Sequence, residues 1–116
     1  MRHQKKKITL DRETSQRRAL MANLAESLIL YEKIKTTKAK AKALRPIVEK
    51  LVTKAKKNDL ASRREIMKVL YTQNAVKKMM DIIGPKYLDR QGGYTRIITL
   101  NRRVGDNAEE AVIEFV

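Results

Sequence analysis

Apolar residues recur at helical spacing in the segment that follows residue 13. The pattern predicts an amphipathic helix that ends near Glu32. Its start is expected at Thr14 or Ser15, because their hydroxyls can accept hydrogen bonds from the free backbone N–H groups of a first helical turn. The residues expected in its buried stripe are Leu20, Met21, Leu24, Leu28 and Tyr31.

The apolar pattern then changes from a helical to an alternating period. The stretch KIKTT at 33–37 alternates and is rich in β-branched residues, which favours a short strand with Ile34 facing inward. A second helix is predicted from Lys38, capped by Thr37. Pro46 removes a backbone hydrogen bond inside it, so we expect a kink or a restart there. Its buried stripe is expected to contain Leu44, Ile47, Val48, Leu51, Val52 and Ala55.

Two shorter helices are predicted in the middle of the chain. The sequence SRRE at 62–65 matches a capping box and would open a third helix. A fourth helix is predicted from Asn74, with Gly84 and Pro85 as its stop. The apolar residues expected to face inward are Ile66, Val69 and Leu70 in the third helix, and Val76, Met79, Met80 and Ile83 in the fourth.

The last quarter of the chain has strand character. Gly92 and Gly93 release the backbone before a β-rich run at 94–100, and AVIEFV at 111–116 places Ala111, Ile113 and Phe115 on one face. Together with 33–37 these strands predict a small mixed or antiparallel sheet. We therefore expect an α+β domain at 14–116, with about four helices on one side of a three-stranded sheet, after a basic extended arm at 1–13.

Charge points to the kind of partner. The chain has 116 residues, and its 27 Lys and Arg against 13 Asp and Glu give a net charge of +14, most of it in the first half. A hydrophobic content of 42% still allows a modest core. Such an excess of positive charge repels itself and usually implies a polyanionic partner, either nucleic acid or, less often, an anionic membrane.

Several classes of chemistry are disfavoured by the residues present. Without cysteine there is no disulfide, zinc ribbon or thiol nucleophile, and the single histidine, His3, cannot form a multi-histidine metal site. Phosphate-binding glycine motifs are missing. The acids Asp106, Glu109 and Glu110 resemble a solvated turn more than a hydrolytic pair. We expect no enzyme, cofactor, metal or small-molecule substrate, and a cytoplasmic location, because neither a membrane-spanning run nor a signal peptide is evident.

Nucleic acid fits better than a membrane, because the second helix has only enough apolar residues for its own core. Aromatic residues are scarce, which favours recognition of a folded RNA by shape over stacking on single strands. A nucleoid-type architectural DNA-binding protein remains the alternative. Lys38, Lys42 and Arg45 share a helical face with Lys56 and no neighbouring acid in sequence, so we expect the first three to contact phosphates. Arg96 could instead pair with an acid across the sheet.

Four motifs, in order along the chain, carry a resemblance to a known family. MRHQKKK, IKTTKAKAKALR, GGYTRI and RVGDNA before an apolar end together resemble the bacterial large-subunit ribosomal protein number seventeen. The resemblance implies a non-enzymatic protein without a cofactor that binds large-subunit rRNA near the peptide exit tunnel, beside neighbouring ribosomal proteins and not as a homo-oligomer. The family usually has Ser-His-Arg where this chain has Gln16 between Ser15 and Arg17, and basic residues where it has Gln4.

The residues expected to contact rRNA combine the basic positions with those that match the family motifs. They are Arg2, His3, Lys5, Lys6, Lys7, Arg12, Arg17, Arg18, Lys35, Thr36, Thr37, Lys38, Lys42, Arg45, Gly92, Gly93, Tyr94 and Arg96. The arm is expected to become ordered only on RNA, because it has dense charge and no apolar face.

Overall fold

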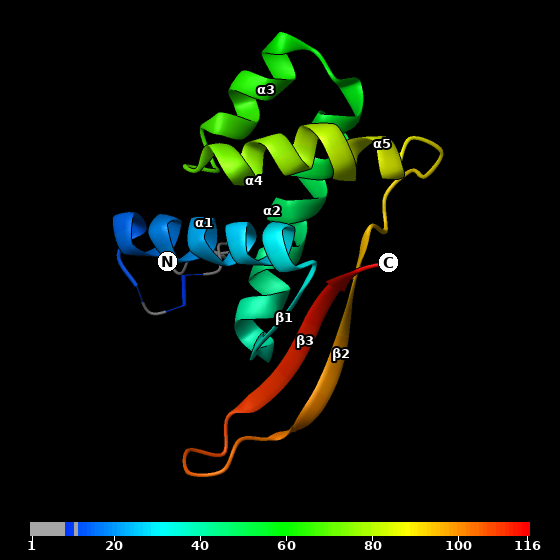
Figure 1. Ribbon diagram of the computed structural model, residues 1–116. Helices are drawn as coiled ribbons and strands as arrows, with labels where there is room; N and C mark the ends of the chain where they lie inside the picture. Colours follow the sequence, from blue (N-terminus) through cyan, green and yellow to red (C-terminus); the bar gives the residue numbers. More distant parts are fainter. Residues whose placement is uncertain (1–8, 11) are drawn as a thin grey trace, which may run out of the picture.

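A computed structural model describes residues 9–10 and 12–116, so most of the predicted arm at 1–13 lies outside it. Four helical segments pack with a three-stranded sheet, which confirms the α+β prediction (Figure 1). The elements, in chain order, are α1 Thr14–Tyr31, β1 Lys33–Thr37, α2 Lys38–Lys57, α3 Leu60–Met67, α4 Gln73–Lys78, the π-helix η1 Met79–Ile83, α5 Gly84–Lys86, β2 Thr95–Arg102 and β3 Glu109–Phe115.

The sheet is antiparallel throughout, with the strand order β1-β3-β2. Ile113 in the central strand pairs with Ile34 on one side and Ile97 on the other. Alternate residues of β3 are buried as predicted, namely Ala111, Ile113 and Phe115. This face packs on α2, while the other face carries Lys33, Lys35, Arg96, Glu110 and Glu114. The hairpin of β2 and β3 extends away from the helices (Figure 1).

The first helix begins at Thr14, within the predicted start, but it has a different N-cap and a rotated stripe. Its N-cap is Glu13, without a side-chain capping bond, so the predicted caps at Thr14 and Ser15 are wrong. Tyr31 was expected in the core but is 74% exposed. The cause is the small residues: Ala22 and Ala25 are fully buried beside Leu28, which turns the stripe away from Tyr31.

The second helix begins where it was predicted. The hydroxyl of Thr37 accepts a hydrogen bond from the backbone N–H of Lys40 at 3.4 Å. The predicted stripe is buried except for Ile47, which is half-buried, and Ala41 and Ala43 are also buried. The helix continues through Pro46 to Lys57, so the predicted restart at the proline is wrong.

The third helix has its N-cap three residues earlier than the predicted capping box places it. Its N-cap is Asp59, whose Oδ1 accepts a hydrogen bond from the backbone N–H of Ser62 at 2.7 Å. This bond lowers the pKa of Asp59. Ser62 itself is buried inside the helix, so it does not act as the cap of the predicted capping box.

The predicted stop at Gly84 and Pro85 is also wrong, because α4, η1 and α5 follow one another without a gap from Gln73 to Lys86. Gly84 has helical angles, with φ −54° and ψ −55°. A Cβ at Gly84 would lie 2.9 Å from the carbonyl oxygen of Ala55 in α2. Glycine is therefore required here for the close contact between two helices. Pro85 fits because the first turn of a helix does not need its N–H.

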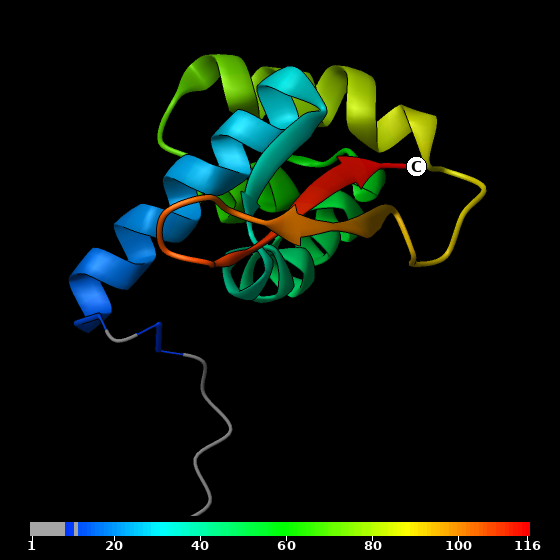
Figure 2. The same ribbon diagram turned by 90° about the horizontal axis from the view of Figure 1, so that it is seen from below.

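Two predicted parts of the site lie far apart in the fold. The beginning of α1 and the loop that contains Gly92 are at opposite sides of the molecule in both views (Figures 1 and 2). Helix α2 passes between them and contacts α1, α3, α5 and all three strands. Any single surface that joins the predicted residues must therefore run along α2.

Candidate nucleic-acid interface

The exposed face of α2 carries a row of lysines that we call the α2 ridge, defined as Lys42, Lys50 and Lys57. Their spacing of eight and seven residues returns to the same side of a helix after about two turns, which places successive lysines roughly 12 and 10 Å apart along the axis. All three side chains are exposed. None forms an ion pair with any residue that the structure describes.

Two hollows border the ridge, one at each end. The first, of about 400 Å³, is lined by Thr37, Lys38, Ala39, Lys42, Ala108 and Glu109. The second, of about 500 Å³, lies between α2 and the loop before β2 and is lined by Pro46, Glu49, Lys50, Thr53, Lys54, Lys57, Gly92 and Tyr94. Concave surfaces with lysines at their edges suit a curved polyanion, because low-dielectric walls strengthen the local positive potential.

Two of the three predicted phosphate contacts on α2 have acidic neighbours after all. Lys38 Nζ lies 3.7 Å from Glu109 Oε2 of β3, and Arg45 Nε lies 3.7 Å from Glu49 Oε2 one turn further along the helix. The expectation that these side chains lack neighbouring acids is therefore wrong, and only Lys42 fits it. A phosphate must compete with a carboxylate at Lys38 and Arg45.

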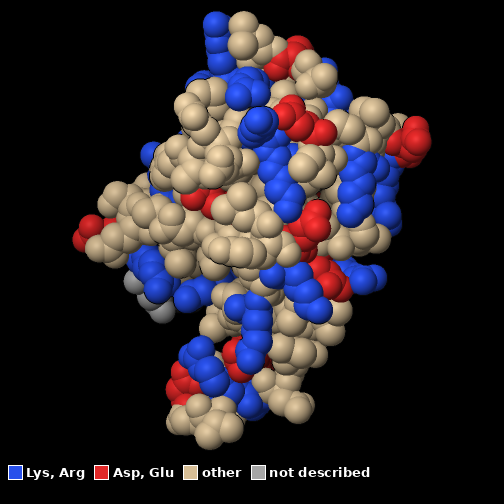
Figure 3. Space-filling model, viewed as in Figure 1, with Lys and Arg blue, Asp and Glu red and all other residues tan. Residues whose placement is uncertain are grey.

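The exposed face of the sheet is likewise paired. Arg96 Nε donates to Glu114 Oε1 at 2.6 Å, so Arg96 takes the acid across the sheet. Lys35 lies 4.0 Å from Glu110. On the hairpin, Arg102 pairs with Glu109. Figure 3 shows acidic and basic side chains together at the hairpin tip, where the charges largely balance locally.

Tyr94 is a core residue in this fold. It is 1% exposed, and its ring lies 5.3 Å from that of Tyr87. Its hydroxyl receives hydrogen bonds from Thr53 at 3.4 Å and from the Lys56 ammonium at 3.0 Å, which lower the pKa of Tyr94 to about 8. The ring is thus unavailable for stacking on a base, and the predicted rRNA contact by this side chain does not fit the fold.

Gly92 and Gly93 are exposed and have positive φ angles of 78° and 62°. A Cβ at either position would have no atom within 4 Å. Their conformation explains why glycine is used. The open space above them leaves the backbone accessible at the edge of the second hollow.

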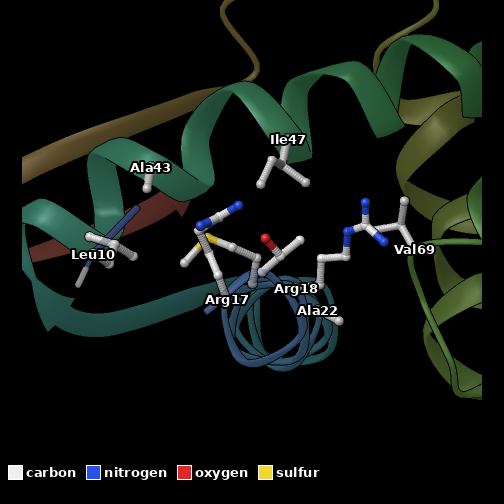
Figure 4. Close-up of a pocket in the computed structure, with 9 residues that line it drawn as sticks. Leu10, Arg17, Arg18, Ala22, Ala43, Ile47 and Val69 are labelled. Atoms are coloured by element: carbon white, nitrogen blue, oxygen red, sulfur yellow. The ribbon is translucent and has the colours of Figure 1, made fainter. Parts of the chain in front are cut away.

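The remaining predicted residues are distributed around the α1 end. Arg17 and Arg18 border a separate apolar hollow against α2 (Figure 4). Arg12 is exposed, and its guanidinium donates to the backbone oxygen of Leu10 at 3.3 Å. Thr36 is half-buried in β1, and Thr37 acts as the cap of α2. Five predicted contacts lie outside the described residues: Arg2, His3, Lys5, Lys6 and Lys7.

Sequence reasoning missed Lys50 and Lys57. The signal was present, because both fall on the helical side of Lys42, opposite the buried stripe. The IKTTKAKAKALR motif ends at Arg45, so the family resemblance does not extend to either lysine. Lys54, on the same half of the helix, lies 4.0 Å from Glu65 and is half-exposed.

Other kinds of site find no support in the part of the chain that the structure describes. It contains no group of three or more His, Cys, Asp or Glu side chains positioned to hold a metal ion. Among residues 9–10 and 12–116, no helix combines the length and the apolar character that a membrane span requires.

Comparison with known proteins identifies the family. The model of the family described as ribosomal protein L17 matches residues 20–116. The large ribosomal subunit protein bL17 of Hydrogenobaculum sp. is 53% identical over 117 residues, which cover 100% of this chain and 99% of that relative. The protein of the same name from Bradyrhizobium diazoefficiens is 54% identical over 100% of this chain and 84% of its own length. The chain therefore belongs to the ribosomal protein L17 family.

Proposed function

We propose that this protein is a structural component of the large ribosomal subunit that binds large-subunit rRNA through the α2 ridge. The observation that carries the proposal is the row of Lys42, Lys50 and Lys57, exposed along one helix and without an ion pair among the described residues. Each lysine that meets a phosphate releases condensed counterions, and this gain in entropy supplies much of the affinity.

The geometry favours a folded RNA over a regular DNA duplex. The basic surface follows α2 from the hollow beside β3 to the hollow beside Gly92, and the hairpin projects to one side of it. A protein that reads the major groove of DNA needs a protruding helix with side chains free on its outer face. Here the lysines of the α2 ridge lie between two hollows and beside a projecting hairpin, so a partner must follow an irregular surface.

In this proposal residues 14–116 act as one rRNA-binding domain, and the protein resides in the cytoplasm as part of the ribosome. It has no enzymatic activity and lies beside other large-subunit proteins. The family resemblance supports a place near the peptide exit tunnel. The arm at 1–13 adds further contacts from its own basic residues.

Sedimentation and competition test the proposal together. The tagged protein should migrate with large subunits when a cell lysate is separated on a sucrose gradient. At physiological salt, a large-subunit rRNA fragment should compete for the purified protein at least tenfold better than duplex DNA of equal length, a difference of about 1.4 kcal/mol. Equal competition by DNA, together with absence from the subunit peak, would refute the proposal in favour of a DNA-binding role.

A further inference from the structure

An apolar hollow lies between α1 and α2. It measures about 410 Å³ and is lined by Leu10, Thr14, Arg17, Arg18, Met21, Ala22, Ala43, Ile47 and Val69. Its size lies within the range of small-ligand pockets, which are mostly apolar with a few polar groups. Figure 4 shows the side chains of Arg17 and Arg18 extending from α1 into the space between the two helices.

We infer that this hollow holds one unstacked nucleotide of the bound RNA, with its base between the apolar walls and its phosphate against Arg17 or Arg18. The inference rests on the proposed function. A nucleotide combines a flat, weakly polar base with an adjacent negative charge. Single-stranded loops and bulges commonly place such bases against apolar side chains or guanidinium planes.

Charge selects this occupant over an apolar peptide. Arg17 and Arg18 are the charged residues among those that line the hollow, and both are positive. A purely apolar partner would leave two guanidinium groups partly desolvated without a counter-charge, which costs free energy. RNA supplies a phosphate at every nucleotide, so base and charge arrive together.

The hollow is also continuous with the α2 ridge. Ile47 in the wall of the hollow lies three residues before Lys50 of the ridge, so the two side chains are neighbours on the surface of α2. An RNA strand that lies on Lys42 and Lys50 passes the mouth of the hollow. The path of the backbone therefore brings a nucleotide to the place where its base can enter.

A single cysteine provides a direct test, because the chain has none of its own. The Ile47→Cys variant puts one thiol in the wall of the hollow, and Ala19→Cys puts one on the exposed opposite face of α1. Alkylation by iodoacetamide is measured with and without a large-subunit rRNA fragment. We expect RNA to slow the reaction at least tenfold for Ile47→Cys and less than twofold for Ala19→Cys.

Two further variants test the contact with the base and the contact with the phosphate separately. Ala43→Leu should weaken RNA binding about tenfold without changing the slope of log K against log salt, since no charge is lost. Arg17→Gln with Arg18→Gln should lower that slope by about one to two. Ala19→Leu, the same change on the exposed face, should leave binding unchanged. If Ala43→Leu does not fold, the two cysteine variants decide the question alone.

The possible outcomes separate a failure of the nucleotide inference from a failure of the proposed rRNA-binding function. If the Ile47→Cys variant binds rRNA strongly but its thiol is not protected, the hollow does not hold a nucleotide, and the proposed ribosomal role still stands. A thiol that is already unreactive without RNA would show that the protein itself fills the hollow. Protection in complete large subunits but not by rRNA would assign the hollow to an acidic protein segment. Failure to bind rRNA at all would overturn both proposals.

Discussion

The carboxylate of Glu49 holds the backbone of Tyr94 against α2. Its Oε1 accepts a hydrogen bond from the backbone N–H of Tyr94 at 2.9 Å, while its Oε2 faces Arg45. The contact joins the loop after α5 to the middle of α2 and forms one wall of the hollow near Gly92. The same group thus anchors the fold and places a negative charge beside the α2 ridge.

Glu49→Gln should therefore strengthen rRNA binding severalfold. The amide oxygen can still accept from Tyr94, while the charge that competes for Arg45 and repels phosphate is removed. Filter binding at physiological salt measures the gain. Glu49→Ala, which leaves the N–H of Tyr94 without its partner, should cost about 1–3 kcal/mol of unfolding free energy in urea. Unchanged or weaker RNA binding by a stably folded Glu49→Gln would contradict this role.

Tyr94 should make stability depend on pH above neutrality. Hydrogen bonds from Thr53 and Lys56 lower the pKa of Tyr94 to about 8, below the ordinary value of 10. Between these values the unfolded chain holds more protons than the folded one, so the free energy of unfolding rises with pH in this window. Urea unfolding from pH 7 to 10 should show this rise relative to Tyr94→Phe. A near-ultraviolet titration of Tyr94→Phe should lack the tyrosine ionisation of lowest pKa that the wild type shows. If the unfolding free energies of the two proteins run parallel over this pH range, the lowered pKa does not belong to Tyr94.

Gly84→Ala should destabilise the protein by about 1–3 kcal/mol, because the new methyl group would collide with the backbone of Ala55. In an ordinary helix the same change stabilises by roughly 0.5–1 kcal/mol. The sign of the effect therefore reports the packing. Thermal unfolding followed by circular dichroism measures it, and an equal or higher midpoint would show that the two helices are not in close contact.

Glu26 should matter more for stability than its place on the polar side of α1 indicates. Its Oε1 accepts from the backbone N–H groups of Tyr71 and Thr72 at 2.8 and 3.0 Å, which ties α1 to the segment before α4. Glu26→Ala should cost roughly 1–2 kcal/mol in urea unfolding. Glu26→Gln keeps an oxygen acceptor and should cost clearly less. Equal losses would show that the charge, and not the acceptor, is what stabilises the contact.

Local pattern predicted the elements of this fold well, and long-range contacts explain the errors. Alternation placed Ile34 and Ile113 correctly, and the hydroxyl of Thr37 caps α2 as expected. Gly84 was interpreted as a helix stop because its neighbour across the fold, Ala55, cannot be seen from sequence.

The candidate site was harder to predict for the same reason. Charge composition and helical spacing located α2. The Arg45–Glu49 pair, four residues apart on that helix, can be predicted from the sequence, but the pair at Lys38 depends on which strand lies beside α2. Glu109 is far from Lys38 in sequence yet lies next to it in the fold, because β3 pairs with β1. Tyr94 belongs to a family motif, and only its burial reveals a packing role.

The most direct test of the α2 ridge compares two sets of neutralised side chains. The triple variant Lys42→Gln, Lys50→Gln and Lys57→Gln removes the ridge. The control variant Arg64→Gln, Lys68→Gln and Lys77→Gln removes the same charge from α3, its C-cap Lys68 and α4. Affinity for a large-subunit rRNA fragment is measured over a range of salt concentrations. The ridge variant should bind at least tenfold more weakly at physiological salt, and its slope of log K against log salt concentration should be smaller by about two to three. The control variant should keep nearly the wild-type slope. Equal losses in the two variants would show that binding follows net charge alone and would contradict the α2 ridge as the rRNA site.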